Sequence, residues 1–86
     1  MDINDLITIV KKKLKNGIII ENIKIEDKSF LHVGHKGNNK KKFHLKILIN
    51  SKELSKISRI QSNKKIYKIL EKEIKEYIHS IQILIT

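Results

Sequence analysis

The sequence predicts an α+β domain in which helices cover one face of a three-stranded sheet. Two long amphipathic segments have apolar residues at helical spacing, and three other segments have the alternating pattern of half-buried strands. They follow one another as helix, strand, strand, short helix, helix and strand. Eighty-six residues are enough for one domain only, so we expect residues 1–86 to form a single α-β-β-α-α-β unit.

The first helix is predicted by an apolar stripe near the N-terminus: Ile3, Leu6, Ile7, Val10 and Leu14. Asp2 or Asn4 can cap its start, and lysines crowd its last turns, where cations favour the negative end of the helix dipole. Asn16 and Gly17 predict its end, with Gly17 in the left-handed conformation that glycine adopts without strain.

The strands are expected at residues 18–27, 43–51 and 79–86. Residues 18–27 are rich in isoleucine, and from Glu21 onward they alternate, with Ile23 and Ile25 on one face. In the second strand, alternation places Phe43, Leu45, Ile47 and Ile49 on one face. We expect the second and third strands to run parallel, because helices connect them. Both then begin at the end of the sheet where the first strand finishes.

Helical spacing returns between the second and third strands. A short helix within residues 52–60 would bury Leu54, Ile57 and Ile60, and a longer one is predicted over residues 62–77. Ser62 or Asn63 can cap the longer helix. Its buried stripe is Ile66, Ile69, Leu70, Ile74 and Tyr77.

Composition excludes several classes of function. Nineteen basic against nine acidic residues give a net charge of +10, which attracts polyanions, but Arg59 is the only arginine and 18 of the cations are lysine. An AT-rich coding sequence also favours lysine, isoleucine and asparagine, so we favour a solvated lysine surface over a nucleic-acid footprint. Zero cysteines exclude disulfides, thiolate zinc sites and cysteine nucleophiles. No apolar segment approaches the length of a membrane span, and we expect no membrane partner.

Residues 1–5 have neither a signal-peptide nor a transit-peptide pattern. We therefore expect a cytoplasmic protein. The alternative is a mitochondrial or other organellar matrix, for a mature chain without its presequence.

Four histidines carry the chemistry: His32, His35, His44 and His79. His32 and His35 lie in the connection formed by residues 28–42, while His44 and His79 begin strands. Neutral imidazole is a good ligand for iron, zinc or copper. The alternative is structural: the strand-end rings make one hydrogen bond each, and the pair in the connection is solvated.

Catalysis has little support. Asp27 and His32 could form a base and its orienting group, but no nucleophile elbow, phosphate loop or oxyanion hole is indicated. We expect the chain not to be an enzyme.

These motifs, taken in order, resemble those of the BolA family. Residues 26–27 match an acidic pair, residues 32–35 a His-Ala-Gly-His loop, and residues 44–51 a His-Phe-Lys strand that ends in serine. Ile60-Gln61 matches a Val-Gln step, Tyr67 a helical tyrosine, and residues 78–81 an Ile-His-Ala-Leu strand. One departure matters: Ser62-Asn63-Lys64 replaces the family's Arg-His-Arg, so the resemblance does not extend to functions that depend on that segment.

The resemblance implies a KH-like fold and a role in iron–sulfur cluster assembly, cluster trafficking or iron signalling. It implies that a [2Fe–2S] cluster is shared with a monothiol glutaredoxin, which supplies its cysteine and a glutathione thiol. In this chain the implied ligands are His79 and His32, with His35 as the alternative and His44 structural. Two imidazoles cannot hold a cluster alone, so no cofactor is expected in the free protein.

The resemblance also leaves a second function open, that of a nucleic-acid-binding transcriptional regulator. However, no Gly-x-x-Gly loop joins two predicted helices, so any such binding should be weak and non-specific. The sequence does not decide whether a homodimer forms or which apoproteins receive the cluster.

Overall fold

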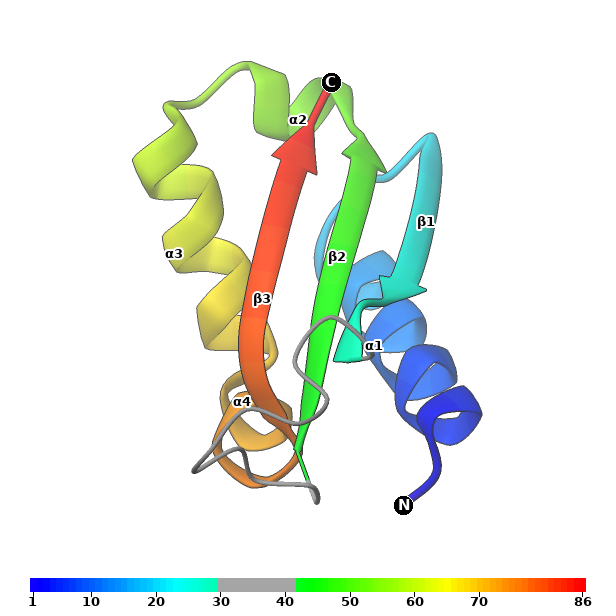
Figure 1. The fold of residues 1–86 in the computed structure, drawn as a ribbon. Helices are drawn as coiled ribbons and strands as arrows, with labels where there is room; N and C mark the ends of the chain where they lie inside the picture. Colours follow the sequence, from blue (N-terminus) through cyan, green and yellow to red (C-terminus); the bar gives the residue numbers. More distant parts are fainter. Residues whose placement is uncertain (30–41) are drawn as a thin grey trace.

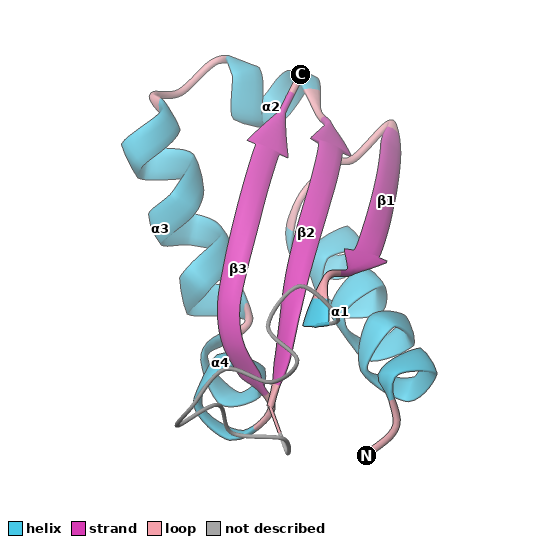
Figure 2. Cartoon of the chain, viewed as in Figure 1, coloured by secondary structure: helices cyan, strands magenta, loops and turns pink. Residues whose placement is uncertain are grey.

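The computed structural model describes residues 1–29 and 42–86, whose elements follow the predicted order (Figure 1). They are α1 (Ile3–Gly17), β1 (Asn22–Asp27), β2 (Phe43–Asn50), α2 (Lys52–Ser55), α3 (Arg59–Ile69), α4 (Glu71–Glu76) and β3 (Ile78–Ile85). The helices lie on one side of the three-stranded sheet, which confirms the α+β class (Figure 2).

The sheet has the order β1-β2-β3, with β2 in the centre. β1 pairs antiparallel to β2, and β2 pairs parallel to β3, as the helical connection between them requires. Asp27 is opposite Leu45, and Phe43 is opposite Ile78. β1 therefore finishes where β2 and β3 begin, and we name this edge the histidine end of the sheet.

The core lies between the sheet and the helices. On the helix-facing side β2 contributes Leu45, Ile47 and Ile49, which are at most 2% exposed. They join Ile23 and Ile25 of β1 and the predicted stripe of α1, of which Leu6, Val10 and Leu14 are fully buried. None of the helices within residues 1–29 and 42–86 has the length and apolar composition that a membrane crossing requires.

The structure confirms the predicted start of α1 and corrects the predicted backbone conformation at its end. The Asp2 carboxylate accepts a hydrogen bond from the Asp5 N–H at 2.9 Å, which confirms Asp2 as the cap. Gly17 is the last helical residue and does not have the expected left-handed backbone. Its lack of a side chain instead accommodates Ile69, because a Cβ at residue 17 would lie 2.9 Å from Ile69 Cδ1.

The second helical region begins earlier than predicted. Ser58, and neither Ser62 nor Asn63, caps α3: its hydroxyl accepts from the Gln61 N–H at 3.1 Å, and Gln61 Oε1 accepts from the Ser58 N–H. Ser62 is instead buried within α3, and its hydroxyl donates to the Leu54 carbonyl at 3.2 Å. Its side chain therefore does not cap the helix.

The single predicted helix over residues 62–77 is two helices. Leu70 leaves the helical conformation, with φ −99° and ψ 15°, so the chain changes direction there and α4 leads into β3. The predicted apolar stripe still faces the core, since Ile66 and Leu70 are fully buried.

Leu54 is buried as expected, but the inward placement of Ile57 and Ile60 was wrong. These side chains are 39% and 68% exposed, because Ile57 lies in the turn that follows α2 and Ile60 lies on the outer side of the first turn of α3.

Candidate functional site

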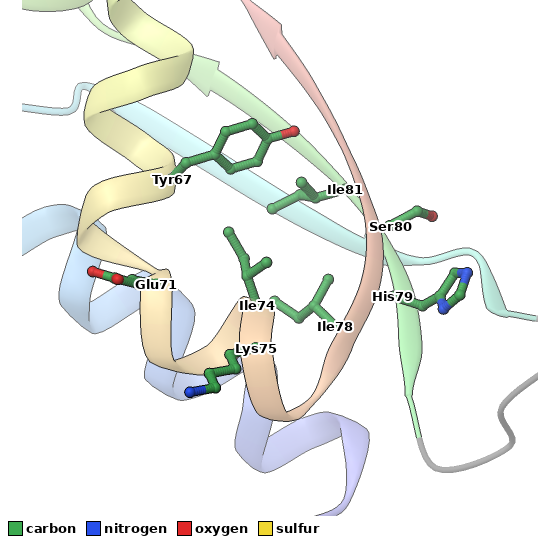
Figure 3. Close-up of a pocket in the computed structure, with 8 residues that line it drawn as sticks. All are labelled: Tyr67, Glu71, Ile74, Lys75, Ile78, His79, Ser80 and Ile81. Carbon is green, nitrogen blue, oxygen red and sulfur yellow. The ribbon is translucent and has the colours of Figure 1, made fainter.

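A β-bulge at His79 shapes the histidine end of the sheet. Phe43 is opposite Ile78 but the next residue, His44, is opposite Ser80, so His79 is an additional residue in β3. Figure 3 shows His79 and Ser80 both pointing away from Ile74 and Ile78. Strict alternation counted back from Ile81 would place His79 on the helix-facing side of the sheet. A bulge of this kind redirects such a side chain to the other face. It therefore aims the imidazole of His79 away from the core.

The sequence carries a signal of this bulge that the alternation argument missed. Two polar residues, His79 and Ser80, separate Ile78 from Ile81, whereas a regular strand would put one residue between apolar neighbours of the same face. Ile78 is buried and Ile81 is partly buried against the core, so both face the helices.

His44 and His79 are brought together, as the parallel pairing of β2 and β3 predicts. Their ring centroids are 5.0 Å apart and the ring planes are inclined by 55°. The two rings differ in environment, because His44 is 4% exposed and His79 is solvent-exposed. An external partner can therefore reach His79 without any change in the core.

His44 is held in place on three sides. Its ring Nδ1 lies 2.5 Å from Ser80 Oγ. Its backbone N–H donates to Ser29 Oγ at 3.0 Å, and its backbone carbonyl accepts from the Lys28 N–H at 2.7 Å. The Asp27 carboxylate accepts from the Ser29 N–H at 2.9 Å and so fixes the turn after β1. Asp27 thus has a structural role, which is to stabilise this turn.

Charges of both signs line the exposed sheet face beside this site. Glu26 lies 3.0 Å from the Lys28 ammonium and 3.5 Å from that of Lys24. The hydrogen bond from Lys28 is the main cause that lowers the pKa of the Glu26 carboxyl from its ordinary value, and Lys24 adds to it.

His32 and His35 lie outside the described residues, so their relation to His79 is a prediction that the structure leaves open. Within residues 1–29 and 42–86, no three His, Cys, Asp or Glu side chains are grouped as a metal site would require.

Two hollows adjoin the histidine end. The larger, of about 630 Å³, lies between α3, α4 and β3, and Figure 3 shows the residues that line it. The smaller, of about 390 Å³, lies on the other side of β3 and is lined by residues that include Lys28, His44 and Ser80.

The segment that replaces the family's Arg-His-Arg also has a clear geometry. Ser62 is buried against α2, Asn63 is half-buried, and Lys64 is exposed. Only one of the three positions therefore presents a positive charge to solvent.

Comparisons with known proteins agree with this architecture. The family model described as BolA-like protein matches residues 14–86. The BolA domain of SufE1 from Arabidopsis thaliana superposes with a TM-score of 0.77 at 25% identity, over 92% of this chain and 87% of that one. BolA1 from Arabidopsis thaliana gives 0.77 at 24% identity over the same shares, and a Bol-like protein from Babesia bovis gives 0.70 at 14% over 91% and 79%.

No curated protein sequence matches the chain. The family model covers most of the chain and every element from the end of α1 to β3, and the solved BolA structures share the fold. The chain belongs to the BolA family.

Proposed function

We propose that this protein shares a [2Fe–2S] cluster with a monothiol glutaredoxin and acts in cluster assembly, cluster trafficking or iron signalling. Membership of a family of generally non-enzymatic regulatory and partner proteins supports a binding role. The observation that carries the proposal is the bulge that presents His79, an exposed imidazole on a fixed backbone, at the histidine end of the sheet.

The backbone around His79 suits a ligand. The Phe43 N–H donates to the Tyr77 carbonyl at 2.8 Å, and the Tyr77 N–H donates to the backbone carbonyl of Glu73 at 2.8 Å. These bonds fix the chain immediately before His79, while the ring itself stays exposed. A ligand held in this way loses little conformational freedom when it binds iron.

The second ligand of the proposal is His32, with His35 as the alternative. Ser29 is anchored to His44 at the histidine end, and three residues of chain span at most about 11 Å, so His32 is within covalent reach of this end. The partner's cysteine and a glutathione thiol would complete the set. A cluster with two imidazole ligands carries less negative charge and has a higher reduction potential than one with four thiolates.

The test is co-expression with a monothiol glutaredoxin, followed by visible absorption and circular dichroism of the purified complex. We expect the complex to be coloured and the free protein colourless. His79→Ala should abolish or shift the spectrum, and Gln82→Ala, at an exposed position on the same strand, should not. An unchanged spectrum for His79→Ala would refute the assignment.

The loop ligand is tested in the same complex. Either His32→Ala or His35→Ala should alter the spectrum. If neither does while His79→Ala does, the second ligand lies elsewhere, and His44 becomes the next candidate.

A nucleic-acid role has weaker support. α3 carries four cations and no acidic residue, but the connection between α2 and α3 contains no glycine, which a KH-type nucleic-acid loop would need. Titration of duplex DNA at two salt concentrations separates the cases. Binding that vanishes at moderate salt without sequence preference would reflect lysine charge alone.

A further inference from the structure

The outer edge of β3 has the features of an interaction surface. Within the described residues β3 pairs only with β2, and residues 78–86 contain no charged side chain in a chain that is 33% charged. Exposed edge strands are usually protected by lysine, proline or inward-pointing charges. Beyond its bulge at His79, β3 has none of these protections.

The helices also leave β3 incompletely covered. Ile81, Ile83 and Ile85 are opposite Leu45, Ile47 and Ile49, yet the three residues of β2 are buried and the three of β3 are only partly buried. The hollow of about 630 Å³ opens here, and Tyr67, which is 44% exposed, extends over it toward Ile81 (Figure 3).

The backbone of β3 has hydrogen-bonding groups on its outer side. The Thr86 N–H donates to Ile49 at 2.8 Å, and the Ser51 N–H donates to the Thr86 carbonyl at 3.4 Å. In a parallel pair, every second residue of a strand directs its backbone N–H and C=O to the neighbouring strand. The even-numbered residues of β3, like Thr86, therefore bond to β2. Ile81, Ile83 and Ile85 therefore direct their N–H and C=O groups to the outer edge.

The charges beside this edge select its partner. Arg59 lines a small hollow with Ile85 and Thr86, Lys75 lines the large one with His79, and Glu71 is the one acidic residue in either lining. α3, which runs alongside β3 in Figure 1, has four cations and no acid. Pairing of two copies through β3 would bring two such helices together, and their like charges would repel.

We propose that the outer edge of β3 binds an extended segment of a partner protein as a fourth strand, with apolar residues at the centre of the segment and acidic residues at both of its ends. The segment's backbone would pair with Ile81, Ile83 and Ile85. Its apolar side chains would enter the hollow beside Tyr67, and its carboxylates would meet Arg59 and Lys75. This mode of recognition combines main-chain hydrogen bonds with side-chain pockets. It requires no cluster and is independent of the proposed glutaredoxin complex.

The probe is a capped nine-residue peptide with valines at its centre and glutamates at both ends, added to the full chain. Amide hydrogen exchange by NMR should slow at least about tenfold at saturation for Ile81, Ile83 and Ile85, because new bonds protect these amides. Exchange at Ser80, Gln82 and Leu84, whose amides already bond to β2, should not change. The same peptide with lysine in place of glutamate should bind at least about tenfold more weakly.

Charge reversal provides the matched comparison. Arg59→Glu combined with Lys75→Glu should weaken peptide binding about tenfold, and Lys12→Glu on α1 less than about twofold. The wild-type exchange pattern decides the question should the double variant fail to fold. Absence of alternating protection, equal binding of the lysine peptide, concentration-dependent protection without peptide, or the same protection by a DNA strand would each overturn the proposal.

Discussion

The ammonium of Lys13 on α1 lies 2.6 Å from Oε2 of Glu73 on α4, and this pair ties the N-terminal helix to the helix that precedes β3. Glu73 is 4% exposed, and within the described residues its Oε1 has no hydrogen-bond partner. A carboxylate so deeply buried depends on its one cation.

Lys13→Met should therefore destabilise the fold by about 1–2 kcal/mol, because it leaves a buried charge uncompensated, although Lys13 itself is partly exposed. The double variant Lys13→Met with Glu73→Leu should recover most of this loss. Urea denaturation of the full double-mutant cycle measures it. Additive losses from the two substitutions would show that the pair is not coupled.

The hydroxyl oxygen of Ser80 lies 2.5 Å from Nδ1 of His44 and holds the imidazole ring in place. Ser80→Ala should lower the free energy of unfolding by about 1 kcal/mol, because a buried ring nitrogen loses this partner. Gln82→Ala, at an exposed position two residues along β3, is the control and should stay within about 0.5 kcal/mol of wild type. Equal stability of the two variants would contradict a structural role for this contact.

The capping box at Ser58 gives a test of where α3 begins. Ser58→Ala should cost about 1 kcal/mol, because the Gln61 N–H loses its acceptor. Asn63→Ala should cost nothing, since the Asn63 side chain caps no helix and its buried oxygen has no partner among the described residues. Thermal unfolding followed by circular dichroism compares the two, and a larger loss for Asn63→Ala would refute the assignment.

Glu53 links three segments and makes stability depend on pH. The Lys65 ammonium at 2.8 Å, followed by the Ile19 N–H, lowers the pKa of the Glu53 carboxyl from its ordinary value of 4.5. Its contribution is therefore complete above that value and is lost as pH falls through the lowered pKa of the folded state. Glu53→Gln should flatten the decrease in urea midpoint between about pH 5 and 3.

The control for that measurement is Glu76→Gln. Glu76 is exposed and forms no ion pair within the described part of the chain. Its variant should retain the wild-type pH profile, and a profile as flat as that of Glu53→Gln would show that the effect comes from net charge alone.

Local patterns explain which features were predictable. The stripe of α1 and the alternation in β2 record which side chains face the core, and both were predicted correctly. Helix boundaries were less predictable, because Ser58, Ser62 and Asn63 are all good caps and tertiary contacts decide among them. The Ser62 hydroxyl bonds to Leu54 eight residues earlier, a partner that no local window contains.

The site was predictable to a similar degree. Parallel pairing of β2 and β3 follows from the helical connection, and it brings His44 beside His79. The bulge that exposes His79 depends on the register between two strands more than thirty residues apart. The two polar residues between Ile78 and Ile81 mark an interruption of the alternation in β3, and the pairing with β2 places the additional residue at His79.

The parallel pairing of β2 with β3 also sets an order of assembly. β1 and β2 are neighbours in sequence and in the sheet, but one edge of β2 stays unpaired until α2, α3, α4 and β3 have all been synthesised. During translation the largely apolar central strand is therefore an open template for other chains. The last strand of the domain closes the sheet and at the same time ends the period in which the nascent chain is most prone to aggregate.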